Sequence, residues 1–212
     1  FTSADLTNTS LADADLTGAT LTSATINRTD LTGANLTSVA AASTTFTDVR
    51  AAGATVNFAN LTGSTLSGGS FAGANLMLAH FDNATITDTD FTSALMPYAT
   101  ATSATLTRPD FTSANLTGVN LANATLASAT ATNANLTLAN LKSTSLTNLT
   151  ATGATLDGAD LTGTAAQGAN LTRVSATGVT APRADLSNAV LMAADLGGST
   201  LSNSSLSGAY GS

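Results

Sequence analysis

The chain has 212 residues, of which only 9% are charged, and its 13 acidic residues are all Asp, giving a formal net charge of −7 at pH 7. It contains no Cys, which excludes a disulfide framework and a thiolate metal site. Its longest apolar runs are a few residues, far short of the roughly 20 that cross a bilayer, so we expect no membrane insertion.

An apolar residue occupies every fifth position from Phe1 to Leu206, without insertion or change of phase. These 42 core positions hold 24 Leu, 6 Phe, 2 Ile, 1 Val, 1 Met and 8 Ala. Two residues before each lies a mostly small residue, such as Ala4 or Ala14. A period of five is neither the helical 3.6 nor the strand period of 2. It indicates a solenoid, in which repeats bury their apolar side chains by stacking on one another.

Residues 4–8 read Ala-Asp-Leu-Thr-Asn, and residues 34–38 and 159–163 follow the same pattern. The chain resembles the pentapeptide-repeat family, whose units read Ala-(Asp/Asn)-Leu-X-X. The resemblance implies an all-β fold, the right-handed quadrilateral β-helix, with four units per coil and with the central Leu or Phe and the preceding Ala pointing inward. It predicts a single β-solenoid over residues 1–212, without separate caps and with about 10.6 coils.

Two features of the pattern depart from this consensus. Pro109 and Leu149 occupy inward positions that normally hold a small residue. Ala166, Ala176 and Ala181 replace the central Leu close together, which predicts a narrower or looser coil near the C-terminal end.

The outward positions show no catalytic arrangement. His80 is the only His, and no Ser pairs with it and an acid in a recognisable spacing. We therefore predict that the protein is not an enzyme and takes no cofactor. Some members of the family mimic DNA and inhibit topoisomerases, but here the Asp residues are scattered over all four faces. This hypothesis ranks low, and we expect no nucleic-acid partner.

Thr follows the core residue in 21 of the 42 units, divided 5, 5, 6 and 5 among the four faces. An ice-binding surface needs its Thr on one face, so this even distribution makes ice binding an alternative only. The alternative function is a monomeric binding module, directed at ice or at a protein partner.

Eleven Asn lie in Asn-X-Ser/Thr sequons and are candidate glycosylation sites. They are Asn8, Asn27, Asn35, Asn60, Asn83, Asn115, Asn123, Asn135, Asn148, Asn170 and Asn203. A surface poor in Lys and rich in Thr, Ser and Asn favours an extracellular or cell-surface location.

Phe58, Leu78 and Tyr98 share one corner position in three successive coils, and Leu138 returns to it later. Two interpretations stay open: a ladder that packs on itself, or a lateral contact for another chain. The candidate lateral interface comprises Phe58, Met77, Leu78, Leu95, Pro97, Tyr98 and Leu138.

No capping segment is recognisable at either end of the repeat, and open end coils of a solenoid invite stacking. The candidate stacking residues are Phe1, Leu6, Leu201, Leu206 and Tyr210. The leading hypothesis is a glycosylated structural protein, the subunit of an extracellular filament whose partner is a second copy of itself, joined head to tail.

Overall fold

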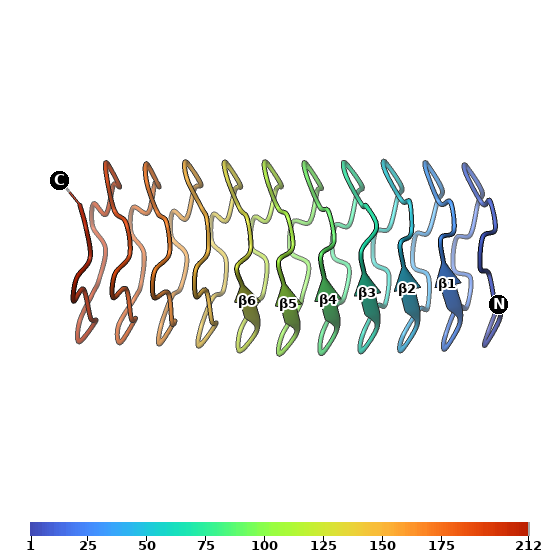
Figure 1. Cartoon of the computed structure of the whole chain (residues 1–212), viewed down its shortest axis with the longest axis horizontal. Helices are drawn as coiled ribbons and strands as arrows, with labels where there is room; N and C mark the ends of the chain where they lie inside the picture. Colours follow the sequence, from blue (N-terminus) through green and yellow to red (C-terminus); the bar gives the residue numbers. More distant parts are fainter. Residues whose placement is uncertain (212) are drawn as a thin grey trace.

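Each five-residue unit makes one side and one corner of a four-sided coil in the computed structural model, which describes residues 1–211 (Figure 1). At the corner, the N–H of the inward small residue donates to the carbonyl of the core residue three positions earlier, as Ala14 does to Leu11 (3.1 Å). The residue before it has a left-handed backbone in every unit from Ser3 to Gly208. This combination is that of a type II turn and explains why Gly, Asn, Asp and Ser predominate at the corner.

Successive coils pair in parallel with a constant offset of 20 residues, from Asp5↔Thr25 to Val190↔Tyr210. The constant register carries the core positions of each coil directly over those of the coil before. The predicted fold class, an all-β parallel solenoid, is confirmed.

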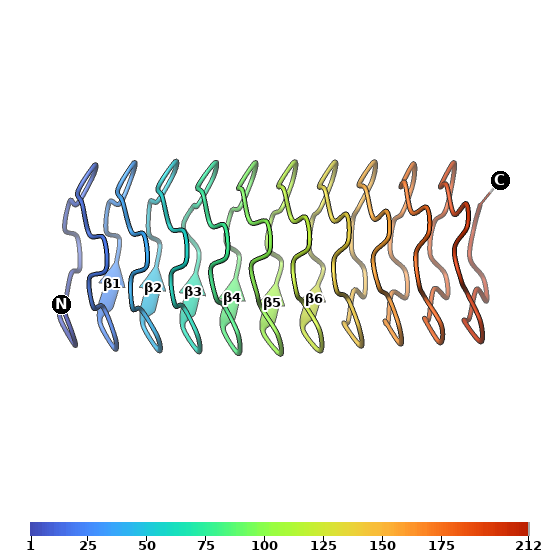
Figure 2. The same cartoon turned by 180° about the vertical axis from the view of Figure 1, so that it is seen from behind.

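Within residues 1–211, regular strands occur on one face, over six successive coils. They form one parallel sheet in chain order, and lie in a single row along the rod (Figures 1 and 2). The strands are β1 (Thr25–Asn27), β2 (Thr45–Thr47), β3 (Thr65–Ser67), β4 (Thr85–Thr87), β5 (Thr105–Thr107) and β6 (Thr125–Ala127). Elsewhere the coils pair through single bridges.

The corner that follows these six strands lacks the turn bond, which all other corners of the described residues have except the one at Val179. In the first coil the N–H of Thr9 donates to the carbonyl of Leu6 (3.2 Å), whereas after β1–β6 no such turn bond forms within the described residues. Pro109 lies at this corner after β5, so its missing N–H costs no hydrogen bond there. Leu149, the other unusual inward residue, is buried and keeps the turn bond to Leu146 (3.0 Å).

The interior of the coils is apolar, with stacked aromatic rings at its centre. The ring of Phe91 stacks on Phe71 and Phe111, with centroids 5.6 and 5.3 Å away. Most polar residues at inward positions donate to the backbone, as the Thr44 hydroxyl does to the Leu21 carbonyl (2.6 Å). The buried hydroxyl of Ser64 is an exception, because it makes no hydrogen bond within the described residues.

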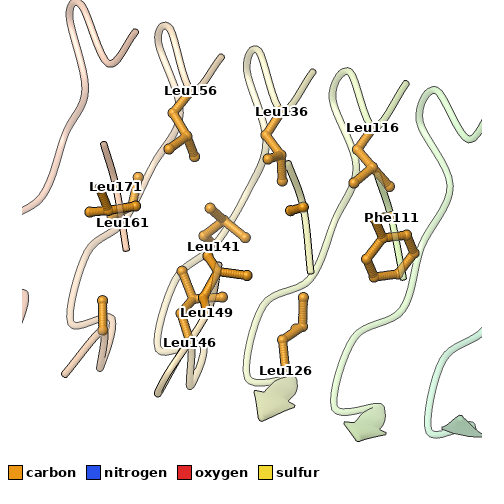
Figure 3. Close-up of a pocket in the computed structure, with 12 residues that line it drawn as sticks. Phe111, Leu116, Leu126, Leu136, Leu141, Leu146, Leu149, Leu156, Leu161 and Leu171 are labelled. Carbon is orange, nitrogen blue, oxygen red and sulfur yellow. The ribbon is translucent and has the colours of Figure 1, made fainter. Parts of the chain in front are cut away.

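The core contains small apolar cavities, of which the one among Phe81, Phe91 and Phe111 is about 10 Å³ and those further towards the C-terminus, where Leu and Ala replace Phe, are larger. Side chains from Phe111 to Leu171 enclose an apolar cavity of about 20 Å³ (Figure 3). Ala166 lines this cavity, and Ala176 and Ala181 line another further on. The 20-residue register continues past them unchanged, so the interior is looser without a change of backbone pairing. None of the described residues forms a helix long and apolar enough to span a membrane.

Candidate functional site

His80, the one His of the chain, is linked to Asp82 only through the hydroxyl of Thr100. Nδ1 of His80 lies 3.1 Å from Oγ1 of Thr100, and that hydroxyl donates to Oδ2 of Asp82 (2.7 Å). His80 therefore does not sit between a nucleophile and an acid, as a catalytic base does. Among residues 1–211, no group of three or more His or Asp residues lies close enough to hold a metal ion.

Most Asp side chains are held by the turn that follows them. Oδ1 of Asp15 accepts hydrogen bonds from the hydroxyl of Thr17 (2.5 Å) and from its backbone N–H (3.0 Å). The hydroxyl and then the backbone N–H lower the pKa of Asp15, because both stabilise the charged form. Asp30 has a lowered pKa for the same reason, through Thr32. These carboxylates cap turns on several faces and do not form a single acidic row.

Four of the predicted lateral residues, Phe58, Leu78, Tyr98 and Leu138, lie along one corner column, and the other three lie beside it. Phe58, Tyr98 and Leu138 are 49%, 55% and 61% exposed; Leu78 and Leu95 are also exposed, whereas Met77 and Pro97 are half-buried. The Tyr98 ring covers Gly118 in the next coil, where a Cβ atom would lie 2.6 Å from it. Leu138 covers Gly158 in the same way. The column thus packs partly on itself, and its role as a lateral contact stays a prediction.

The eleven candidate glycosylation sites are all at least partly exposed, but they differ in hydrogen bonding. In the five Asn-Leu-Thr sequons whose Leu is a core residue, the Asn side chain accepts a bond from the backbone N–H of the Thr, as Asn35 does from Thr37 (3.1 Å). The same bond occurs at Asn60, Asn115, Asn135 and Asn170. The other six side chains make no hydrogen bond within residues 1–211: Asn8, Asn27, Asn83, Asn123, Asn148 and Asn203.

The predicted stacking residues are exposed at both ends, with one exception. Phe1, Leu206 and Tyr210 are exposed, and Leu201 is half-buried. Leu6 is buried, because the second coil covers it and its N–H donates to the Thr25 carbonyl (2.9 Å). The expectation that Leu6 offers a free stacking surface is therefore wrong.

The structure reveals a further surface, which we call the Thr face: the outward side chains of β1–β6. One row has Thr in all six strands: Thr25, Thr45, Thr65, Thr85, Thr105 and Thr125. The parallel row is Asn27, Thr47, Ser67, Thr87, Thr107 and Ala127. A count of only the Thr residues that follow core residues does not reveal this face. A count of the Thr residues that precede core residues, made separately for each side of the coil, would have revealed it.

A four-sided parallel β-solenoid built from five-residue units defines the class of protein. The family model for pentapeptide repeats matches the chain in eight copies, over residues 1–37, 59–96, 104–142, 139–175 and 169–208. The chain belongs to the pentapeptide-repeat family, as the sequence pattern predicts. Such proteins are generally structural or binding proteins and not enzymes.

A solved structure shows the same fold. The chain is similar to HetL from the cyanobacterium Nostoc sp. strain PCC 7120, a pentapeptide repeat protein involved in the regulation of heterocyst differentiation. The TM-score is 0.73 at 27% identity, covering 97% of this chain and 86% of HetL. Rfr23 from the cyanobacterium Cyanothece 51142 gives a TM-score of 0.33 at 25% identity, covering 46% of this chain and 64% of that one.

QnrB1, a plasmid-mediated fluoroquinolone resistance protein, gives a TM-score of 0.44 at 15% identity, covering 95% of this chain and 91% of that one. No curated protein sequence matches the chain.

Proposed function

We propose that the chain is a non-catalytic structural rod, the subunit of an extracellular filament that grows by end-to-end stacking of solenoids. The supporting observation is that the backbone groups left open on the first and last coils are complementary.

Every internal pair of coils is joined by two kinds of backbone bond. The N–H of Thr25 donates to the Ala4 carbonyl in the coil before it (2.9 Å), and the N–H of Leu6 donates forward to the Thr25 carbonyl (2.9 Å). Each coil thus has one set of backbone donors and acceptors that faces the preceding coil, the backward set, and a complementary set that faces the following coil, the forward set.

At the first coil the backward set is open, and at the last coil the forward set is open. Within residues 1–211, the N–H groups of Ser10 and Thr20 donate to no backbone acceptor, and neither do those of Leu201 and Leu206. A second copy placed head to tail would pair these sets as internal coils do. Such a contact is heterologous and does not close, so it generates filaments rather than a ring or a dimer.

Stacking would also bury apolar surface. Phe1 at one end and Leu206 at the other are exposed, while their counterparts inside the rod, such as Leu21 and Leu186, are buried. Burial of such side chains contributes about 25 cal/mol per Å² of apolar surface, against which the loss of translational and rotational freedom on association must be set.

The outward residues support a location outside the cell. They are dominated by uncharged hydroxyl and amide groups, and the six free sequon side chains can carry glycans without disturbing the core. We include glycans on five of these residues in the proposal and leave out Asn27, because it lies in the outward row of β1.

The test of end-to-end stacking uses variants that block one end without altering the rod. Ser10→Pro with Thr20→Pro removes two open N–H groups that donate to no backbone acceptor within the described chain. The matched control, Ser10→Ala with Thr20→Ala, keeps both donors.

Sedimentation velocity at rising concentration should show large assemblies for the parent and the Ala control, and short rods for the Pro variant. Circular dichroism should show the same β signal in all three. A parent chain that sediments as a monomer at every concentration would contradict the proposal.

A further inference from the structure

We propose that the Thr face is an ice-binding surface, whose ligand is the crystalline lattice of water. This inference is independent of end-to-end stacking, because it concerns a side of the rod and not its ends.

The first ground is the regularity of the Thr face. Strands β1–β6 pair in exact register, so Thr45 lies beside Thr25 and Thr65 along the row. Neighbouring strands are about 4.8 Å apart, and alternate residues along a strand are about 6.6 Å apart. Two rows of hydroxyl-bearing residues therefore form a two-dimensional grid. Hexagonal ice repeats its oxygen positions at distances of this size in two directions, whereas a flexible macromolecule does not.

The second ground is that the hydroxyls of the Thr face are free. None of the Thr or Ser hydroxyls in its two rows makes a hydrogen bond within residues 1–211. Elsewhere on the rod, the hydroxyl of the Thr that follows a core residue commonly donates to the Asp or Asn that precedes the same core residue, as Thr112 does to Asp110 (2.6 Å). The Thr face has Thr in place of that Asp or Asn, and so its second row has no such acceptor.

The same face changes where the Thr pattern stops. In the first coil the Thr7 hydroxyl donates to Asp5. After β6 the Thr147 hydroxyl lies 3.3 Å from Ser145 and donates to Gln167 (3.3 Å). Free hydroxyls and regular strands thus coincide over the same six coils.

The third ground is charge. No residue of either row is charged, which complements a neutral lattice whose sites both donate and accept hydrogen bonds. Thr supplies one donor, two acceptor lone pairs and a methyl group, so it serves both the polar and the apolar parts of an ordered water layer. The bordering corner carries two residues of each sign, Arg28, Asp48, Asp88 and Arg108. Of these, Arg108 and Asp88 form an ion pair (2.7 Å).

The fourth ground is rigidity. The β-branched Thr side chains have few rotamers, and the ladder fixes the backbone beneath them. Little side-chain freedom is therefore lost when the face orders water, which favours binding to a preformed solid.

The experiment measures thermal hysteresis and partition into a growing ice front, with the full chain made in a host that adds no glycans. Thr65→Tyr places a bulky ring in the middle of the grid, on a strand where Tyr is well tolerated. Thr55→Tyr is the matched control, because Thr55 has the same place in its unit on a different face. Thr65→Val removes the hydroxyl and keeps the shape.

The parent and Thr55→Tyr should both cause thermal hysteresis and enter the ice. Thr65→Tyr should lose both properties, with an unchanged β signal in circular dichroism, and Thr65→Val should lose part of the activity. A folded parent that is excluded from ice would overturn the proposal. Equal loss of thermal hysteresis in the Thr65→Tyr and Thr55→Tyr variants would also overturn it. The proposal would fail as well if the chain were excluded from ice and bound to crystalline cellulose instead.

Discussion

Single residues at the corners of the coil carry the strictest backbone demands. Gly69 has a φ of +75°, and a Cβ atom there would lie 2.5 Å from the carbonyl oxygen and 2.6 Å from the nitrogen of Val49. These are backbone atoms of the coil before it, so a side chain cannot move aside to make room. At Gly73, which also has a positive φ, a Cβ atom would meet nothing within 4 Å.

Gly69→Ala should therefore destabilise the rod more than Gly73→Ala. The Gly73 variant has only the left-handed backbone cost of about 1–2 kcal/mol, whereas the Gly69 variant adds a backbone clash. Chemical denaturation followed by circular dichroism measures both. Equal losses of stability would show that the two coils do not approach each other so closely at Gly69.

The Asp residues that cap turns make stability depend on acid. Hydrogen bonds from the hydroxyl of Thr17 and its backbone N–H lower the pKa of Asp15 below its ordinary value of 3.8. Hydrogen bonds from Ser175, and from the backbone N–H of Thr177, do the same for Asp157. A carboxyl whose pKa is lower in the folded state stabilises that state above the unfolded pKa and loses the contribution as pH falls through the folded pKa.

The thermal midpoint should therefore be flat near neutral pH and should fall once the pH drops below 3.8. Asp15→Asn should reduce this acid sensitivity, because an Asn oxygen accepts the same bonds, as Asn35 does from Thr37. Thermal melts across this pH range provide the measurement. A midpoint that rises on acidification would contradict the assigned role of the carboxylates.

Much of the residue-level pattern could be predicted from the sequence. The central Leu or Phe and the small inward residue recur strictly, because each must fit the same interior in every coil. The Thr face was not predicted, since it depends on which units share a side and on which hydroxyls are already bonded. The burial of Leu6 was missed because the second coil covers part of the first.

At the scale of elements, the corner after β1–β6 makes its own prediction. Ala129 follows β6 and, like Pro109, uses no backbone N–H within the described chain, whereas Ala134 donates to the Ala131 carbonyl (3.1 Å). Ala129→Pro should change stability by less than about 1 kcal/mol, and Ala134→Pro should cost about 3 kcal/mol.

Both positions are buried and both follow a residue with a left-handed backbone, so they form a matched pair. Thermal denaturation of the two variants measures the loss of stability that each Pro causes. If Ala129→Pro were as damaging as Ala134→Pro, the two corner types would not differ as described.

The sequence does not reveal this difference between corners, because both types hold a left-handed residue at the same place in the unit. Pro109 was the one sign in the sequence that this corner lacks a turn bond. Without knowledge of the backbone hydrogen bonds, it could be interpreted only as a departure from the consensus. The distinction follows from how far a strand extends before the chain bends, which pairing with the neighbouring coils determines.

For the whole molecule, the stability of the rod is the sum of similar contacts between neighbouring coils. The same donors and acceptors recur at each junction, and the first and last coils present them unpaired within residues 1–211. Under the proposed function, a junction between two copies would use the same kinds of backbone donor and acceptor as a junction inside the chain.

Cryo-electron microscopy of the chain at high concentration tests whether two copies join end to end in the way that neighbouring coils do. We predict filaments with an axial subunit repeat near 50 Å and a coil spacing of about 4.8 Å that continues unbroken across the subunit junction. Discrete rods of single-chain length, or filaments whose coil spacing is interrupted at each junction, would contradict it.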